Sequence, residues 1–110
     1  MKAEITVLDY PIRAEAVRLD AGWDVGVFGG CSTHIGAVTF AEADGSLRTM
    51  QRPHHKDGFI TERWARELSE CLQAPVCVRC GIHYDHATGE QLAAITAACD
   101  ALLGRIKEKL

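Results

Sequence analysis

Three short polar segments of this sequence hold the residue types that most often do chemistry, and all five histidines lie in them. Residues 29–36 read Gly-Gly-Cys-Ser-Thr-His-Ile-Gly, residues 53–57 read Pro-His-His-Lys-Asp, and residues 81–88 read Gly-Ile-His-Tyr-Asp-His-Ala-Thr. Imidazoles bind ligands and exchange protons near neutral pH, and a lysine can hold a phosphate as a point charge. Glycine lets the backbone approach a ligand closely. These segments indicate one site if the fold brings them together.

The first half of the chain has the alternating apolar pattern of strands. We predict strands at residues 3–9, 14–20, 22–28, 35–43 and 46–52. The short connections contain turn signals, among them Pro11, the double glycine after the third strand, and Asp-Gly-Ser after the fourth. Short turns favour a five-strand antiparallel meander.

The second half changes to the period of a helix. Residues 57–72 predict an amphipathic helix with Asp57 as its N-cap. Residues 76–82 predict a sixth strand, and a last helix begins at Thr88, with Gln91 at the spacing of a capping box. We therefore predict a single α+β domain over residues 1–110, with a mostly antiparallel six-stranded sheet (five-strand meander, then helix–strand–helix) and two helices packed on the sheet.

Strand geometry brings the three polar segments to one end of such a fold. Successive turns of a meander alternate between the ends of the sheet, so residues 29–36 and 53–57 share an end. The sixth strand then runs parallel to the fifth and returns to that end at His83. Both helices begin there, and a helix N-terminus carries a partial positive charge. With Lys56 and His55 alongside, the arrangement predicts an anion site suited to a phosphate.

Composition disfavours several classes of protein. The net charge of −3 and a pI near 5.9 disfavour nucleic acid as a partner. No apolar run is long enough to span a membrane, and we expect no signal peptide, so a cytoplasmic protein with free thiols is predicted. Cys77 and Cys80 stand at an odd offset in a predicted strand, on opposite faces, so we expect neither a disulfide nor a shared metal.

The residues alone leave three classes of function open. A cofactor-binding protein needs no catalytic constellation, and none is apparent. A small metal- or histidine-dependent enzyme would use His34, His83, Asp85 and His86. A structural subunit that docks on a larger protein would need no site at all. Three observations on the purified protein would separate these classes. A bound coloured or fluorescent species would favour the cofactor-binding protein, a stoichiometric metal the enzyme, and a ligand-free protein the structural subunit.

The three segments, in this order, resemble the LpdD-type family, small D subunits of gallate-decarboxylase-like systems described as prenylated-flavin chaperones. The resemblance rests on the double glycine at 29–30 followed by residues 34–38, on residues 55–57, and on residues 81–88. It implies a fold like the proteasome-assembly chaperones and a homodimer. It also implies non-catalytic binding of reduced prenylated FMN and its delivery to a prenylated-flavin-dependent decarboxylase. Together with the convergence of the segments, it places the cofactor at Gly30, His34, Ile35, Gly36, His55, Lys56, His83, Asp85 and Thr88.

Four positions depart from the pattern of that family. Cys31 stands where an acid is usual, and Thr33 stands where a proline is usual. His54 replaces a usual glycine, and His86 replaces a usual asparagine. All four lie within the three polar segments, so this chain differs from the family pattern inside its predicted site.

Overall fold

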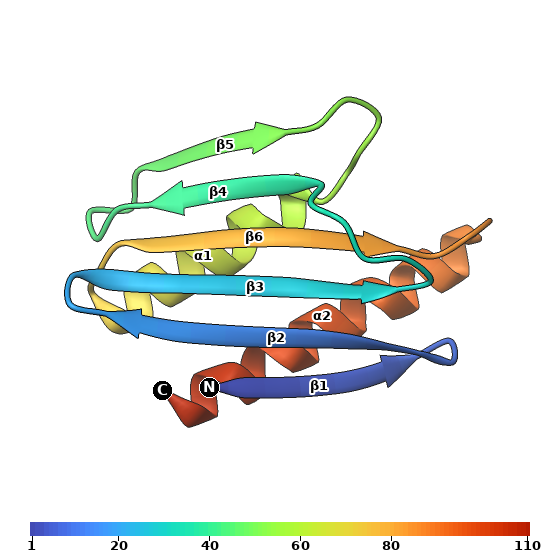
Figure 1. Ribbon diagram of the computed structural model, residues 1–110, viewed down its shortest axis with the longest axis horizontal. Helices are drawn as coiled ribbons and strands as arrows, with labels where there is room; N and C mark the ends of the chain where they lie inside the picture. The colour runs from blue at the N-terminus through green and yellow to red at the C-terminus, as the bar shows by residue number, and fades with distance from the viewer.

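A single six-stranded sheet with two helices on one of its faces makes up the computed structural model, which describes residues 1–110 (Figure 1). The strands are β1 (Lys2–Val7), β2 (Tyr10–Leu19), β3 (Gly22–Gly30), β4 (Ala37–Ala41), β5 (Leu47–Gln51) and β6 (Val76–His83), and the helices are α1 (Gly58–Leu72) and α2 (Gly89–Lys109). The predicted α+β class, with a mostly antiparallel sheet and two helices packed on it, is confirmed.

The order of the strands differs from the prediction in one respect. The sheet runs β1-β2-β3-β6-β4-β5, so the predicted meander is interrupted between its third and fourth strands. The strand β6 enters there, parallel to β3 and antiparallel to β4, and therefore points in the same direction as β5, as predicted. The nearly continuous apolar run of β6 suits a central strand with neighbours on both sides.

The connection between β3 and β4 is a crossing rather than a tight turn. It passes over the end of β6, where Cys31 N–H donates to the His83 carbonyl at 2.7 Å and Gly36 N–H donates to the Cys80 carbonyl at 2.8 Å. Because β3 and β4 lie two strand spacings apart, the connection must cover about 10 Å. The residues of the first polar segment are thereby laid directly against the residues of the third.

The first turn also lies elsewhere than predicted. The strands β1 and β2 meet at a two-residue turn, Leu8–Asp9, whose φ angles of 51° and 70° are both left-handed. Pro11 is not in that turn but in β2, opposite Thr6 of the edge strand. A proline is tolerated close to the start of a strand, whereas Leu-Asp is not the glycine-containing pair that usually marks a turn of this kind.

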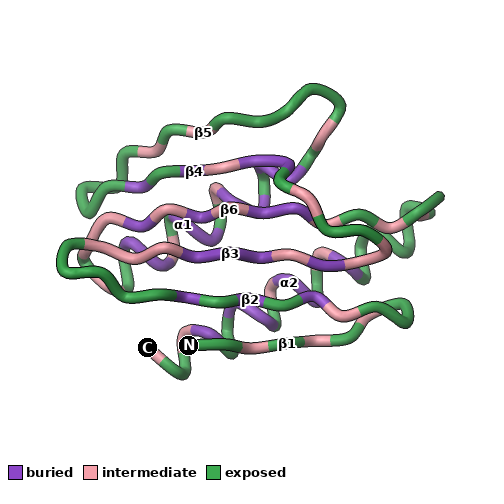
Figure 2. The backbone as a smooth tube through the Cα atoms, viewed as in Figure 1, coloured by how far each residue is buried: buried purple, intermediate pink, exposed green.

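The core lies between the sheet and the helices (Figure 2). Its side chains come from alternate positions of the strands and from one face of each helix, and the largest fully buried ones include Trp64, Leu68, Leu102 and Ile106. Ion pairs between Arg63 and Asp100 and between Glu67 and Lys107 join the two helices. Neither helix has both the length and the hydropathy needed to cross a membrane.

A chain of buried hydroxyl groups fixes α1 to the hairpin of β4 and β5. The Thr39 hydroxyl lies 2.7 Å from that of Thr61 in α1 and 2.8 Å from that of Thr49 in β5. Thr49 in turn donates to the Glu62 carboxylate at 2.6 Å. Since that carboxylate only accepts, Thr49 donates to Glu62 and Thr39 donates to Thr49. The Thr61 hydroxyl also lies within hydrogen-bond distance of the Gly58 carbonyl, at 3.1 Å. The network sets the position of the first turn of α1, which borders the candidate site.

Candidate functional site

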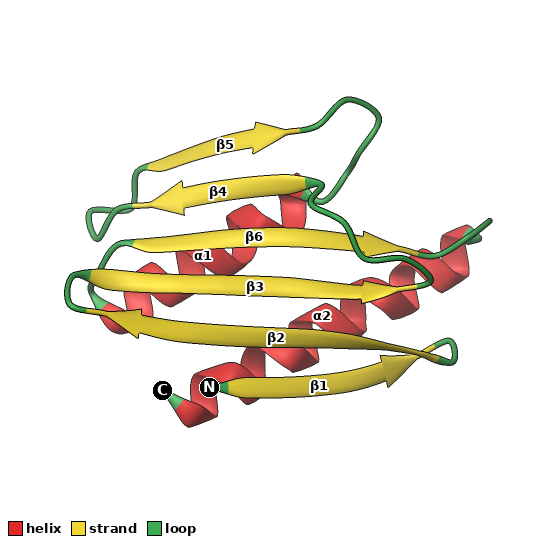
Figure 3. Cartoon of the chain, viewed as in Figure 1, coloured by secondary structure: helices red, strands yellow, loops and turns green.

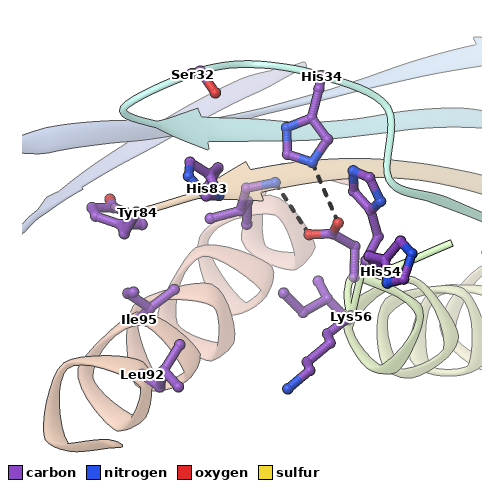
Figure 4. A pocket seen from close by; sticks show the side chains of 12 residues that line it. Ser32, His34, His54, Lys56, His83, Tyr84, Leu92 and Ile95 are labelled. Atoms are coloured by element: carbon purple, nitrogen blue, oxygen red, sulfur yellow. Dashed lines mark hydrogen bonds and ion pairs between the residues drawn. The ribbon is translucent and has the colours of Figure 1, made fainter. Parts of the chain in front are cut away.

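The three polar segments do meet, at the end of the sheet where β3, β5 and β6 finish (Figure 3). A pocket with a volume of about 520 Å³ lies among them, within the size range of small-molecule sites. Its lining residues come from all three segments and from both helices (Figure 4); they are Ser32, His34, His54, His55, Lys56, Asp57, Ile60, Ile82, His83, Tyr84, Leu92 and Ile95. The predicted convergence at one end of the sheet is confirmed.

Three imidazole rings form the polar part of this pocket. The ring of His34 lies 5.0 Å from that of His55 and 6.4 Å from that of His83, measured between centroids. The Nδ1 atom of His55 is 2.8 Å from the Pro53 carbonyl, which only accepts, so Nδ1 carries a hydrogen. The Nε2 atom of His83 likewise faces the Asp85 carboxylate at 2.9 Å. In a neutral ring, the opposite nitrogen then keeps its lone pair.

Asp57 occupies the N-cap position of α1, as we predicted, but its side chain is a buried member of the site. Its side chain makes no capping hydrogen bond to α1 and is 8% exposed. Its Oδ1 atom accepts from Ile82 N–H at 3.2 Å, and its Oδ2 atom lies 3.6 Å from Nε2 of His34. A side chain at Gly36 would overlap Oδ2, which explains the glycine at that position. Asp57 thus links the start of α1 to β6 and to the crossing loop.

Two further groups support the site from within the protein. Burial, and then the charge of Asp57, raise the pKa of the Cys80 thiol, so the neutral S–H group lies 3.9 Å from Oδ1 as a weak donor. Burial raises the pKa of Tyr84, and its phenol donates to the carbonyls of Val7 at 3.0 Å and Tyr10 at 3.2 Å. Tyr84 thereby holds the turn between β1 and β2 against the wall of the pocket.

The opposite part of the pocket is apolar. Ile60 of α1, Ile82 of β6 and Ile95 of α2 line it, and Leu92 adds a side chain that is 53% exposed. Lys56 is exposed on the α1 side of the mouth, across from Leu92 (Figure 4). The pocket therefore combines an apolar cleft between the two helices with a rim of imidazoles and one ammonium group.

The helix N-termini contribute less to an anion site than the sequence indicates. Gly58 N–H at the start of α1 already donates to the Gln51 side chain at 2.8 Å. The predicted capping box of α2 is present, with Thr88 and Gln91 each satisfying the other's backbone N–H. Side chains of the protein thus accept from these donors, and the positive charge available to an anion is that of Lys56.

The structure brings together four of the nine residues named from the sequence, namely His34, His55, Lys56 and His83. The other five lie beside the pocket without lining it. Gly30 has φ of 85°, and a side chain there would overlap the His83 carbonyl. This glycine therefore allows the β3–β4 connection to pass close to the end of β6. Ile35 is 50% exposed, Gly36 packs on Asp57, Asp85 holds the ring of His83, and Thr88 caps α2.

Sequence reasoning missed eight lining residues. Ser32, His54, Asp57 and Tyr84 lie in the polar segments and were not assigned to the ligand; Ile60, Ile82, Leu92 and Ile95 belong to apolar patterns that resemble a core. The four apolar residues could have been predicted from their positions, because they stand in the first turns of the two helices and at the end of a strand. Those positions face the segments that carry the histidines.

Two departures from the family pattern coincide with unusual backbone. His54 has φ of 64° and His86 has φ of 53°, both in the left-handed region. Glycine and asparagine, which the resemblance leads us to expect at these positions, adopt that region with the least strain. These two histidines therefore replace residues that the turns themselves favour.

No group of three histidine, cysteine, aspartate or glutamate side chains is arranged to hold a metal ion. Cys77 and Cys80 both lie in β6, and only Cys80 is buried among the core residues, as expected for side chains on opposite faces.

Fold and pocket together define a small α+β protein with a pocket that joins an apolar cleft to an imidazole-rich rim with one lysine. The sequence profile of the family described as "Prenylated flavin chaperone LpdD-like domain" matches residues 6–110. Protein LpdD of Lactiplantibacillus plantarum is 33% identical over an alignment of 99 positions that covers 84% of this chain and 73% of that protein. The chain belongs to the LpdD-like family of prenylated flavin chaperones, as its sequence motifs predicted, and this membership supports a chaperone role.

Proposed function

We propose that this protein binds reduced prenylated FMN without transforming it and delivers it to a prenylated-flavin-dependent decarboxylase. The observation that carries the proposal is the division of one pocket into an apolar cleft and a basic rim. A prenylated flavin has the same division, with a large, mostly apolar ring system at one end and a phosphate at the other. Membership of a family of prenylated flavin chaperones supports the same ligand.

The residues suggest one orientation of the ligand. Lys56 suits the phosphate at the exposed side of the pocket. The ring system then lies between α1 and α2, against Ile60 and Ile95. His34 and His83 face the polar edge of the rings, where a flavin has carbonyl and ring-nitrogen groups.

Anaerobic titration with reduced prenylated FMN tests the binding step. We expect a saturable change in the absorbance or fluorescence of the flavin that ends at one flavin per chain, and the ligand recovered afterwards should be unchanged. Absence of saturable binding, or recovery of a converted product, would contradict the proposal. A parallel titration with reduced FMN, which lacks the prenyl group, shows how much that group contributes to the affinity.

Delivery is tested with a cofactor-free decarboxylase of the prenylated-flavin-dependent class. Cofactor supplied on this protein should activate the decarboxylase faster than the same concentration of free cofactor in the presence of oxygen. Bovine serum albumin at equal concentration controls for unspecific protection. Equal rates with and without this protein would refute delivery while leaving binding intact.

We also propose that the protein is a homodimer. The outer strands β1 and β5 leave two unpaired sheet edges, and the face of the sheet away from the helices exposes Phe40 by 46% and Met50 by 81%. Light scattering should therefore give a mass near twice the 12.0 kDa of one chain. A single species of 12.0 kDa at tens of micromolar, about the concentration at which a stable interface is populated, would exclude the dimer.

A further inference from the structure

The contact between Asp57 and His34 carries an inference about hydrogen bonding in the pocket. We propose that Asp57 is the positioning residue of the site: it holds neutral His34 with its hydrogen on Nε2, so that Nδ1 accepts a hydrogen bond from an N–H group of the ligand. The inference deepens the function proposed above and rests on it for the identity of the ligand. The pairing of Asp57 with His34 itself rests on the geometry alone.

The separation and burial of the two groups decide which nitrogen of His34 carries the hydrogen. Nε2 faces Oδ2 of Asp57 at 3.6 Å, which is too long for a hydrogen bond but close for a charge and a dipole. The two side chains are only 8% and 22% exposed, so water screens their interaction little. A carboxylate oxygen offers only lone pairs, so a lone pair on Nε2 would be repelled and an N–H group attracted.

Asp57 cannot easily turn away from the ring. Its Oδ1 atom accepts from Ile82 N–H at 3.2 Å, and Gly36 packs against the carboxylate from the crossing loop. The backbone carbonyl of Asp57 accepts from Ile60 and Thr61 in the first turn of α1, at 3.1 Å each. The strand β6 and the crossing loop therefore hold the carboxylate, and the first turn of α1 holds its backbone.

The remaining ring nitrogen of His34, Nδ1, lies on the side of His83 (Figure 4). In each of the other two imidazoles, one ring nitrogen also donates to an acceptor of the protein: His55 donates from Nδ1 to a carbonyl, and His83 donates from Nε2 to a carboxylate. When neutral, each ring keeps one lone pair that the protein does not use. The pocket is therefore richer in acceptors than its histidine content implies, and it suits a ligand that donates N–H groups.

This polarity bears on the redox state of a flavin. In unmodified FMN, the reduced ring carries an N–H group at N5, where the oxidised ring has a bare nitrogen. An acceptor at Nδ1 of His34 would then favour the reduced form by about three- to tenfold, the value of one hydrogen bond between neutral groups. Selectivity for the reduced form would thus depend on Asp57, a residue that need not touch the ligand.

The first test needs no variant and no ligand. Nitrogen–proton correlation NMR of the ligand-free protein at pH 8, where an ordinary imidazole is neutral, reports which nitrogen of His34 is protonated. We expect a protonated Nε2 and a bare Nδ1. A hydrogen on Nδ1, or a doubly protonated ring at this pH, would overturn the inference whatever the ligand proves to be.

The second test compares dissociation constants for reduced and oxidised FMN. In Asp57→Asn, the new amide can donate to Nε2 of His34, so Nδ1 should become the protonated nitrogen and the preference for reduced FMN should fall by about three- to tenfold. Asp20→Asn, which removes the same charge from a turn at the far end of the sheet, should keep the preference of the wild type. If Asp57→Asn does not fold, His34→Gln takes its place, and the same fall is expected.

An unchanged preference in the site variants would overturn the inference about selectivity even if both flavins bind. Failure of the wild type to bind either flavin would instead contradict the proposed function. In that case the NMR result still decides whether Asp57 sets the protonated nitrogen of His34.

Discussion

Substitution of Lys56 by alanine tests how the pocket holds a phosphate. Lys56 is exposed at the mouth of the pocket and forms no ion pair with another residue, so its removal should leave the fold intact. Two unit charges about 4 Å apart attract by about 1 kcal/mol in bulk water and by about 4 kcal/mol at the effective dielectric constant near a protein surface. Exposure of Lys56 places the expected loss towards the lower value, at about 1–2 kcal/mol. The dissociation constant of reduced FMN should then rise about five- to thirtyfold.

The assay is an anaerobic titration of the wild type and Lys56→Ala with reduced FMN and with reduced riboflavin, which lacks the phosphate. The loss should be confined to FMN. Lys109→Ala, which removes the same charge at the opposite end of α2, should bind both ligands like the wild type. Raising the salt concentration should weaken FMN binding in the wild type more than in Lys56→Ala, because exposed charges are screened.

Each contrary result has a definite meaning. Equal losses for FMN and riboflavin would show that Lys56 does not meet the phosphate and acts on the ring or on the loop. No loss for either ligand would remove the basic rim from the binding site. A similar loss of FMN affinity in Lys109→Ala would show that the effect of Lys56 comes from the net charge of the protein and not from a contact with the phosphate.

Three further predictions concern the protein without ligand. Thr39→Val should lower the free energy of unfolding by about 1–3 kcal/mol in urea titrations, because it removes two hydrogen bonds, one to the buried Thr61 hydroxyl and one to the half-buried Thr49 hydroxyl; Thr39→Ser should lose clearly less, and equal losses would contradict the network. His54→Gly should raise the free energy of unfolding by about 1 kcal/mol by relieving left-handed backbone, and a lower melting temperature would argue against this. Thiol titration of the denatured, non-reduced protein should find all five cysteines free, whereas two missing thiols mapped to Cys77 and Cys80 would refute their separation on opposite faces of β6.

Local patterns in the sequence were sufficient for most elements of the fold. The six strands, both helices and the capping box at Thr88 follow from alternation, helical periodicity and capping chemistry, all of which act over a few residues. The Leu8–Asp9 turn escaped because its residues lack the usual turn chemistry, while the nearby Pro11 offered a false signal. Pairing between distant strands has no comparable local signal, so the place of β6 between β3 and β4 could not be read from spacing.

The candidate site also has a part that the sequence predicted and a part that it did not. The directions of the strands alone place His34, His55, Lys56 and His83 at one end, and the insertion of β6 changes none of these directions. Asp57 was interpreted from its local position before a helix, where aspartate usually caps. Its burial depends on the crossing loop and on β6, which are remote in the sequence.

The central position of β6 has a consequence for how the protein acquires its site. The centre of the sheet is synthesised after both of its flanks, so β1–β3 and the β4–β5 hairpin exist for a time as two separate pieces, each with an open inner edge. Contacts between parts so distant along the chain form slowly, and unpaired edges invite association with other chains. Once β6 joins the two pieces, its last residues also bring Asp57, the crossing loop and His83 together. Completion of the sheet and assembly of the pocket are therefore one folding event, and a nascent chain that stops short of β6 has neither.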